Sequence, residues 1–137
     1  MALTHLVDTS VLTRLRTPAV RVVIERLLAQ ERVGRARITD LELGFSARNA
    51  REWDDIAAAT DRFGRVEIDP AVVNRALAVQ RALAGAGLRG RKVPDLLIAA
   101  AAELAELTLL HYDTDFEHIT RLTGQPGEWV VPAGSID

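Results

Sequence analysis

Residues 3–10 read Leu-Thr-His-Leu-Val-Asp-Thr-Ser, a sequence typical of a strand that leads directly into a helix. Its apolar residues before Asp8 predict a short buried strand, and Asp8, Thr9 and Ser10 supply side chains that cap a helix. A strand that passes directly into a helix is typical of folds in which parallel strands alternate with helices. Asp8 then stands at the carboxyl end of its strand, where open sheets of this kind bind their ligands.

The same alternation of strand and helix continues along the chain. Further short strands are expected at 36–38, 66–68, 107–110 and 129–131, and helices are expected to begin at or near Pro18, Thr39, Asn49, Pro70, Pro94 and Asp115. Gly34 should close the helix from Pro18, and the glycines of 85–90 should end the helix from Pro70. The helix from Pro94 is nearly all apolar and should be buried on most sides. We therefore predict an α/β fold with a mostly parallel sheet of about five short strands, covered on both faces, with residues 1–137 forming a single domain.

Composition narrows the class of protein. A chain of 137 residues can bury a real core, and 48% of its residues are hydrophobic with few aromatics. It has no cysteine, which excludes disulfides, thiolate zinc sites and thiol nucleophiles. The first residues do not form a signal peptide, and the longest apolar run is too short for a membrane helix, so we expect a cytoplasmic protein without membrane contact.

Four acidic residues fall where such a sheet would gather its loops: Asp8, Glu42, Asp95 and Asp113. If the fold brings them together, each like-charged pair repels by roughly 4 kcal/mol at an effective dielectric near 20. A cation would relieve that repulsion, and a set of oxygen ligands favours Mg²⁺ or Mn²⁺. Because these ions also bind substrate phosphate, the pattern indicates phosphodiester chemistry.

Each acid also has a purely structural interpretation. Asp8 and Asp95 could simply stabilise the first turns of helices. Thr39 and Glu42 have the spacing of a capping box, in which the glutamate reaches back to the start of its own helix. Asp113 and Asp115 could be a turn residue and a cap. The joint pattern carries the metal hypothesis, because independent caps need not face one crevice.

Other local patterns do not support a different function. Residues 85–90 have dinucleotide-binding spacing, but they follow a helix instead of a strand. The segment from Asp113 resembles a calcium loop, yet His118 stands where that loop needs glycine. The three histidines lack zinc-protease spacing, so we interpret His111 as structural or supporting. The net charge of −2 does not by itself indicate nucleic-acid binding, although arginines and Lys92, the one lysine, flank the acids.

Four segments in this order, LVDTS, ITDLELGFSAR, KVPDLLIAAAA and LLHYDTDFEHI, resemble the PIN-domain nucleases, particularly the VapC-type toxins of type II toxin–antitoxin systems. The likeness spans essentially the whole chain. It implies a three-layer α/β/α sandwich and a Mg²⁺- or Mn²⁺-dependent endoribonuclease that hydrolyses RNA phosphodiester bonds by metal-activated water.

The resemblance also implies roles for individual residues. Asp8, Glu42, Asp95 and Asp113 match the acidic quartet of the family, and Asp115 matches an additional acid near the metal. The expected catalytic set is therefore these five, and the expected metal ligands are Asp8, Asp95, Asp113 and Asp115. Arg89, Arg91 and Lys92 are candidates for RNA contact. His111 departs from the Thr or Ser of many relatives.

Partners follow from the same resemblance. We expect a cognate antitoxin that inserts a basic side chain into the acidic pocket, an RNA substrate that is tRNA or another structured RNA, and a homodimer. Leu43, Phe45 and Trp53 are candidates for the dimer or antitoxin contact. The main alternative is a catalytically silent PIN-like module that binds RNA or a protein, and a phospho-acceptor receiver domain is disfavoured because Lys92 precedes a helix instead of following a late strand.

Overall fold

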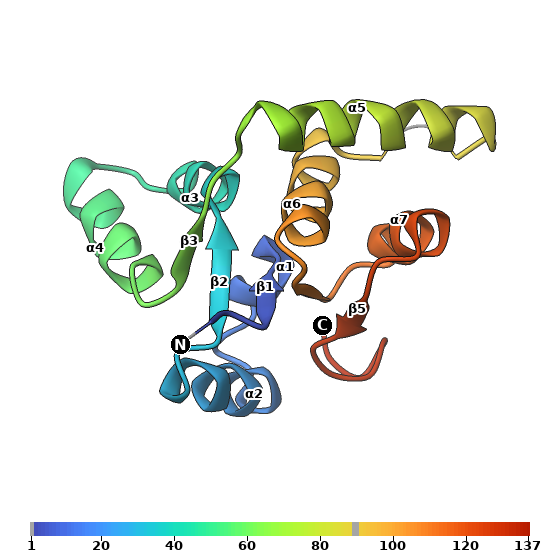
Figure 1. Cartoon of the computed structure of the whole chain (residues 1–137). Coiled ribbons are helices and arrows are strands. Elements are labelled where there is room, and N and C mark those ends of the chain that lie inside the picture. The colour runs from blue at the N-terminus through green and yellow to red at the C-terminus, as the bar shows by residue number, and fades with distance from the viewer. Residues whose placement is uncertain (1, 89–90) are drawn as a thin grey trace.

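The structure is a computed structural model that describes residues 2–88 and 91–137. Its strands are β1 (His5–Val7), β2 (Val33–Ala36), β3 (Gly64–Val66), β4 (Thr108–His111) and β5 (Gly127–Trp129). Its helices are α1 (Thr9–Leu12), α2 (Pro18–Ala29), α3 (Arg37–Gly44), α4 (Ala50–Thr60), α5 (Pro70–Gly85), α6 (Val93–Leu104) and α7 (Asp115–Thr123). Strands and helices alternate, as the sequence predicts (Figure 1).

All five strands run parallel in the order β3-β2-β1-β4-β5. The chain builds outward from β1 to β3 on one side and then returns to place β4 and β5 on the other. The strand order therefore reverses between β1 and β4, which pair through Val7 and Leu110. In open α/β sheets a crevice forms beyond the carboxyl ends of the strands at such a reversal. Asp8 follows β1 directly, and Asp113 comes two residues after β4.

Two apolar layers cover the sheet. Leu6 and Leu109 pack with α5, α6 and α7, whereas the next residues, Val7 and Leu110, face α1 and α2 on the other side. This division follows from the two-residue period of a strand. The result is the predicted α/β/α sandwich; in Figure 1 α2 lies at the bottom, α5 runs along the top and α6 stands beside the strands.

Helix α6 is the most deeply buried helix of the sandwich. Its alanines from 99 to 102 are at most 2% exposed, and it packs against α3, α5, α7 and β4. The small side chains let these elements approach closely, and Pro94 fits the first turn because no hydrogen bond is lost there. The predicted all-apolar buried helix is confirmed, and its rigid N-terminus holds Asp95.

Three predicted strand positions are wrong, each by two or three residues. The strands expected at 36–38, 66–68 and 129–131 lie at β2, β3 and β5, each of which contains a glycine. A Cβ on Gly34 would lie 2.7 Å from Leu3 Cδ1, and one on Gly127 would lie 2.7 Å from Thr120 Cγ2. These glycines are strand residues on which a neighbouring side chain packs directly. Gly34 therefore does not end α2, which closes at Ala29.

Strand β2 also contains Arg35, which is 2% exposed. Its guanidinium donates to both carboxylate oxygens of Asp40 at 3.0 and 3.2 Å and to the carbonyl of Phe63. A buried charge is tolerated when it is paired and hydrogen-bonded in this way. The same shift in β2 moves the start of α3 to Arg37, so Thr39 lies inside the helix and not at its cap.

Candidate metal centre

Asp8 is held at the junction of β1 and α1. It has extended backbone geometry and caps α1, with its Oδ2 accepting a hydrogen bond of 2.9 Å from the Ser10 amide. The side chain is 3% exposed, and its Oδ1 is buried without a hydrogen-bond partner. Burial raises the pKa of Asp8 to about 6, although the hydrogen bonds from Ser10 oppose the increase. Asp8 is therefore both a cap and a carboxylate with one free oxygen.

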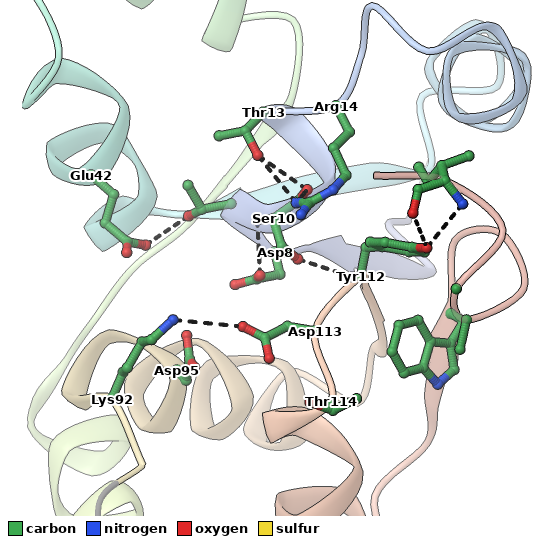
Figure 2. A pocket seen from close by; sticks show the side chains of 15 residues that line it. Asp8, Ser10, Thr13, Arg14, Glu42, Lys92, Asp95, Tyr112, Asp113 and Thr114 are labelled. Carbon is green, nitrogen blue, oxygen red and sulfur yellow. Dashed lines mark hydrogen bonds and ion pairs between the residues drawn. The ribbon is translucent and has the colours of Figure 1, made fainter.

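Asp95 lies in the first turn of α6 and is 6% exposed. Its Oδ2 has no hydrogen-bond partner. Burial raises its pKa to about 7, and the negative charges of Asp8 and Asp113 raise it further, while the charge of Lys92 opposes them. Because the charges of Asp8 and Asp113 raise the pKa of Asp95, the three carboxylates must lie close together. The structure thus brings Asp8, Asp95 and Asp113 together from three separate elements, as Figure 2 shows.

Asp113 and Asp115 complete the cluster at the end of β4. The Asp115 amide donates to Asp113 Oδ1 at 2.9 Å, which fixes the first carboxylate at the start of α7. Carboxylate oxygens of Asp95, Asp113 and Asp115 all lie within 4.8 Å of one another. Asp8 is not in this closest group of three, but it lines the same cavity with its unpartnered Oδ1, so the donor atoms of the site are all carboxylate oxygens. The residues present fit a hard divalent cation.

Glu42 reaches the same cavity from α3. Its Oε1 accepts a hydrogen bond of 2.7 Å from the Thr9 hydroxyl, which also lies 3.0 Å from Thr39 Oγ1. The carboxylate adds to the charges that raise the pKa of Asp8. The capping-box interpretation of Thr39 and Glu42 is wrong because α3 begins before Thr39, so both side chains point to Thr9 instead.

Basic residues at the start of α6 pair with the acids. Arg91 Nη1 donates to Asp115 Oδ1 at 2.7 Å, and Lys92 Nζ lies 3.8 Å from Asp113 Oδ2. Lys92 is 68% exposed, so it can leave this weak pair for a phosphate. Arg89 lies outside the described residues. These two pairs place positive charge at the rim of the cluster.

His111 supports the site through packing. Its ring lies 5.2 Å from Phe116 and 5.0 Å from Trp129, and its Nδ1 accepts a hydrogen bond of 3.3 Å from the Asp113 amide. Burial lowers the pKa of His111 to about 4, so the ring is neutral at pH 7 with its proton on Nε2. This geometry agrees with a structural or supporting role.

Four of the acids, Asp8, Glu42, Asp95 and Asp113, line one cavity of about 620 Å³, and Asp115 lies behind its wall beside Asp113. Sequence reasoning missed much of its wall, which includes Arg14, Tyr112, Trp129 and the C-terminal residues Ala133, Gly134 and Ile136. The Tyr112 hydroxyl donates to the Ile136 carbonyl at 2.8 Å, and Arg14 Nε donates to the Asp137 carbonyl at 2.8 Å. No local sequence pattern predicts these contacts, because their partners lie 24 and 123 residues apart in the sequence.

The PIN domain family model matches residues 5–122. The chain is 53% identical to Ribonuclease VapC51 of Mycobacterium tuberculosis over 137 residues, which cover all of both chains. It is 40% identical to Ribonuclease VapC21 of the same species, over 98% of this chain and 99% of that protein.

Solved structures show the same fold at lower identity. DNA-bound VapBC from Salmonella typhimurium has a TM-score of 0.78 at 19% identity, and covers 94% of this chain and 99% of that one. FitAcB from Neisseria gonorrhoeae has a TM-score of 0.69 at 20% identity, over 90% and 96% of the two chains. These structures agree in fold, and the family model together with the 53% identity to Ribonuclease VapC51 establishes that the chain belongs to the PIN-domain family and, within it, to the VapC proteins.

Proposed function

We propose that this protein is a metal-dependent endoribonuclease and the toxin of a VapBC-type toxin–antitoxin pair, with residues 1–137 acting as one PIN domain. The observation that carries the proposal is the convergence of acids from four parts of the chain on one cavity, where two buried carboxylate oxygens lack any donor. The 53% identity to Ribonuclease VapC51 supports the same activity. Hydrolysis of RNA phosphodiester bonds is the reaction that this set of groups serves.

The proposed metal ligands are Asp8, Asp95, Asp113 and Asp115, with Mg²⁺ as the ion and Mn²⁺ as its substitute. When bound, the ion would lower the pKa of water and neutralise charge on the phosphoryl group. Asp8 and Asp113 are held in place by the backbone amides of Ser10 and Asp115, so their oxygens need no reorganisation when the ion arrives. This is the preorganisation that electrostatic catalysis requires.

Glu42 has a separate proposed role. It is held by Thr9 and sits beside Asp8, where it adds negative charge without belonging to the closest group of three acids. We assign it to completing the site, by holding a water or a second ion on the side of α3. All five acids are proposed catalytic residues on this basis.

The RNA substrate must approach a pocket that carries negative charge until a metal ion binds in it. Arg91 and Lys92 supply positive charge at its rim, and the N-terminus of α6 adds the positive end of a helix dipole. Because Arg91 is already paired with Asp115, Lys92 is the freer of the two to contact phosphate. Such limited basic surface favours a structured RNA, such as a tRNA, whose shape supplies further contacts.

A cognate antitoxin and a second copy of the chain are the proposed protein partners. Phe45, directly after α3, is 92% exposed, Trp53 on α4 is 48% exposed, and Leu43 on α3 is half-buried. Large apolar side chains exposed on neighbouring helices are typical of a protein interface. Among the described residues, no helix is long and apolar enough to cross a membrane. An RNA substrate places the proposed activity in the cytoplasm.

The proposal is tested with purified, antitoxin-free protein, total RNA and Mg²⁺, followed by mapping of new 5′ ends. We expect cleavage by the wild type and none by Asp113→Asn, in which the side chain can still accept the Asp115 amide. Asp55→Asn, an exposed acid on α4, is the matched control and should cleave normally. Binding without Mg²⁺-dependent cleavage would instead identify a silent RNA-binding module.

A further inference from the structure

The cavity that holds the acids has a second wall that the metal chemistry does not use. Besides the carboxylates, it is lined by two aromatic side chains, Tyr112 and Trp129, and by Arg14. Aromatic rings beside a basic side chain are the groups with which proteins hold unpaired nucleotides, by stacking on bases and pairing with phosphates.

Tyr112 is already engaged. Its ring is 9% exposed and lies beneath the Arg14 guanidinium, 5.0 Å from the ring centroid. Its hydroxyl donates to the Ile136 carbonyl, and its backbone amide donates to Ser10 Oγ at 2.9 Å. These contacts leave Tyr112 as a support for its neighbours.

Trp129 is held firmly but is still partly open. The half-buried indole donates from Nε1 to Glu117 Oε1 at 3.1 Å. The ring of His111 meets it at 59°, and the ring of Tyr112 meets it edge-on at 87° and 5.3 Å. Neither neighbour stacks parallel to the indole. The ring is therefore oriented by three side chains without a parallel partner among the described residues.

Arg14 adds a positive charge to the same wall. Its Nη1 donates to the Ser10 carbonyl at 2.7 Å (Figure 2), and its Nε donates to a backbone oxygen of Asp137, the last residue of the sequence, at 2.8 Å. Within the described residues it forms no ion pair with an Asp or Glu side chain, in contrast to Arg91. These hydrogen bonds use Nε and Nη1 and leave Nη2 without a partner among the described residues, so Nη2 can donate to a phosphate in the cavity.

We propose that Trp129 is a stacking platform for the base of a nucleotide adjoining the scissile phosphate, and that Arg14 contacts the phosphate of that nucleotide. The inference rests on the proposed ribonuclease function and names a substrate subsite for it. Because every base has a stacking face, this subsite should strengthen binding of single-stranded or extruded nucleotides with little choice of sequence.

Tryptophan fluorescence tests the platform directly, because the chain has two tryptophans. Trp53→Phe leaves Trp129 as the reporter, and Trp129→Phe leaves Trp53 on α4 as the matched control. Both are made in an Asp113→Asn background to prevent cleavage. A short single-stranded oligoribonucleotide is titrated into each protein, and binding is followed separately by the anisotropy of a label on the RNA. We expect RNA binding to quench Trp129 and leave Trp53 unchanged.

The chemistry of the contact is tested by two further changes. Trp129→Leu should weaken oligonucleotide binding by about 5-fold or more, whereas Trp129→Phe should retain most of it, since phenylalanine still stacks. An oligonucleotide with abasic positions should bind the wild type and Trp129→Leu equally. Thermal melting checks that each variant is folded. If Trp129→Leu does not fold, the quenching experiment still tests the proposal, because it does not use that variant.

The outcomes separate the subsite from the function. RNA that binds without quenching Trp129, or that quenches Trp53 instead, would overturn the subsite while leaving the nuclease proposal intact. Failure of the wild type both to bind and to cleave RNA would overturn both.

Discussion

Asp8→Asn should stabilise the metal-free protein at the same time as it removes metal binding. The folded pKa of Asp8 is about 6 against an ordinary value of 3.8, because the group is buried. A carboxyl group with a raised folded pKa holds its proton more tightly in the folded state. Its ionisation therefore destabilises the fold as the pH rises above 3.8, and the full penalty is present above about pH 6.

The size of the effect follows from this difference in pKa. The gap between about 6 and 3.8 corresponds to about 3 kcal/mol at pH 8. Asparagine has no charge to bury and can still accept the Ser10 amide as a helix cap, so little is lost in exchange. Removing the charge also relieves Asp95, whose pKa the charge of Asp8 raises. Both effects should make Asp8→Asn more stable than the wild type in the absence of metal.

The assay is urea unfolding at pH 5 and pH 8 in EDTA and in Mn²⁺. In EDTA at pH 8 the variant should be more stable than the wild type by up to about 3 kcal/mol, and the advantage should shrink at pH 5. Mn²⁺ should stabilise the wild type and not the variant, because a ligand stabilises only the state that binds it. Asp55→Asn should match the wild type throughout. A variant that is less stable than the wild type at pH 8 in EDTA would show that the buried charge of Asp8 does not destabilise the fold.

Three further predictions concern the site and the core. Lys92→Gln should weaken RNA binding and reduce the dependence of that binding on salt, measured by anisotropy at two ionic strengths, and an unchanged salt dependence would remove Lys92 from the RNA interface. Arg35→Met should lower the free energy of unfolding by about 1–3 kcal/mol, because it removes the donors to Asp40 and to the Phe63 carbonyl while Asp40 keeps Arg37 at 2.9 Å, and no loss in urea unfolding would contradict the role given to the pair. Gly34→Ala should destabilise by about 1–3 kcal/mol, because the new Cβ would meet Leu3 and the Gly64 carbonyl, whereas Gly85→Ala, which meets nothing within 4 Å, should not destabilise; equal melting temperatures for the two would count against close packing at β2.

The sequence predicted the order of elements well, because β1, α5, α6 and β4 have clear apolar patterns and clear boundaries. It misplaced β2, β3 and β5, because glycine is ordinarily a sign of a turn. Here Gly34 and Gly64 pair in register, and both lie against Leu3. That packing depends on residues far apart in the chain and leaves no local pattern.

The acid cluster could be anticipated from strand ends and helix starts, since parallel strands bring these positions to one edge. The hydrogen-bond partner of Glu42 could not be anticipated in this way. Its hydrogen bond to Thr9 crosses 33 residues and competes with a plausible local cap. The wall formed by Arg14, Tyr112 and the C-terminal residues was missed for the same reason, because nothing in the sequence says where the chain end returns.

A crystal structure of the protein soaked in Mn²⁺ would show directly whether acids from separate elements form one pocket for a divalent ion. Anomalous scattering should show Mn²⁺ contacting carboxylate oxygens of Asp8, Asp95 and Asp113, with Asp115 and Glu42 beside it. Crystals saturated with Mn²⁺ that show no ion between these carboxylates, or carboxylates that lie apart on separate surfaces, would contradict the account.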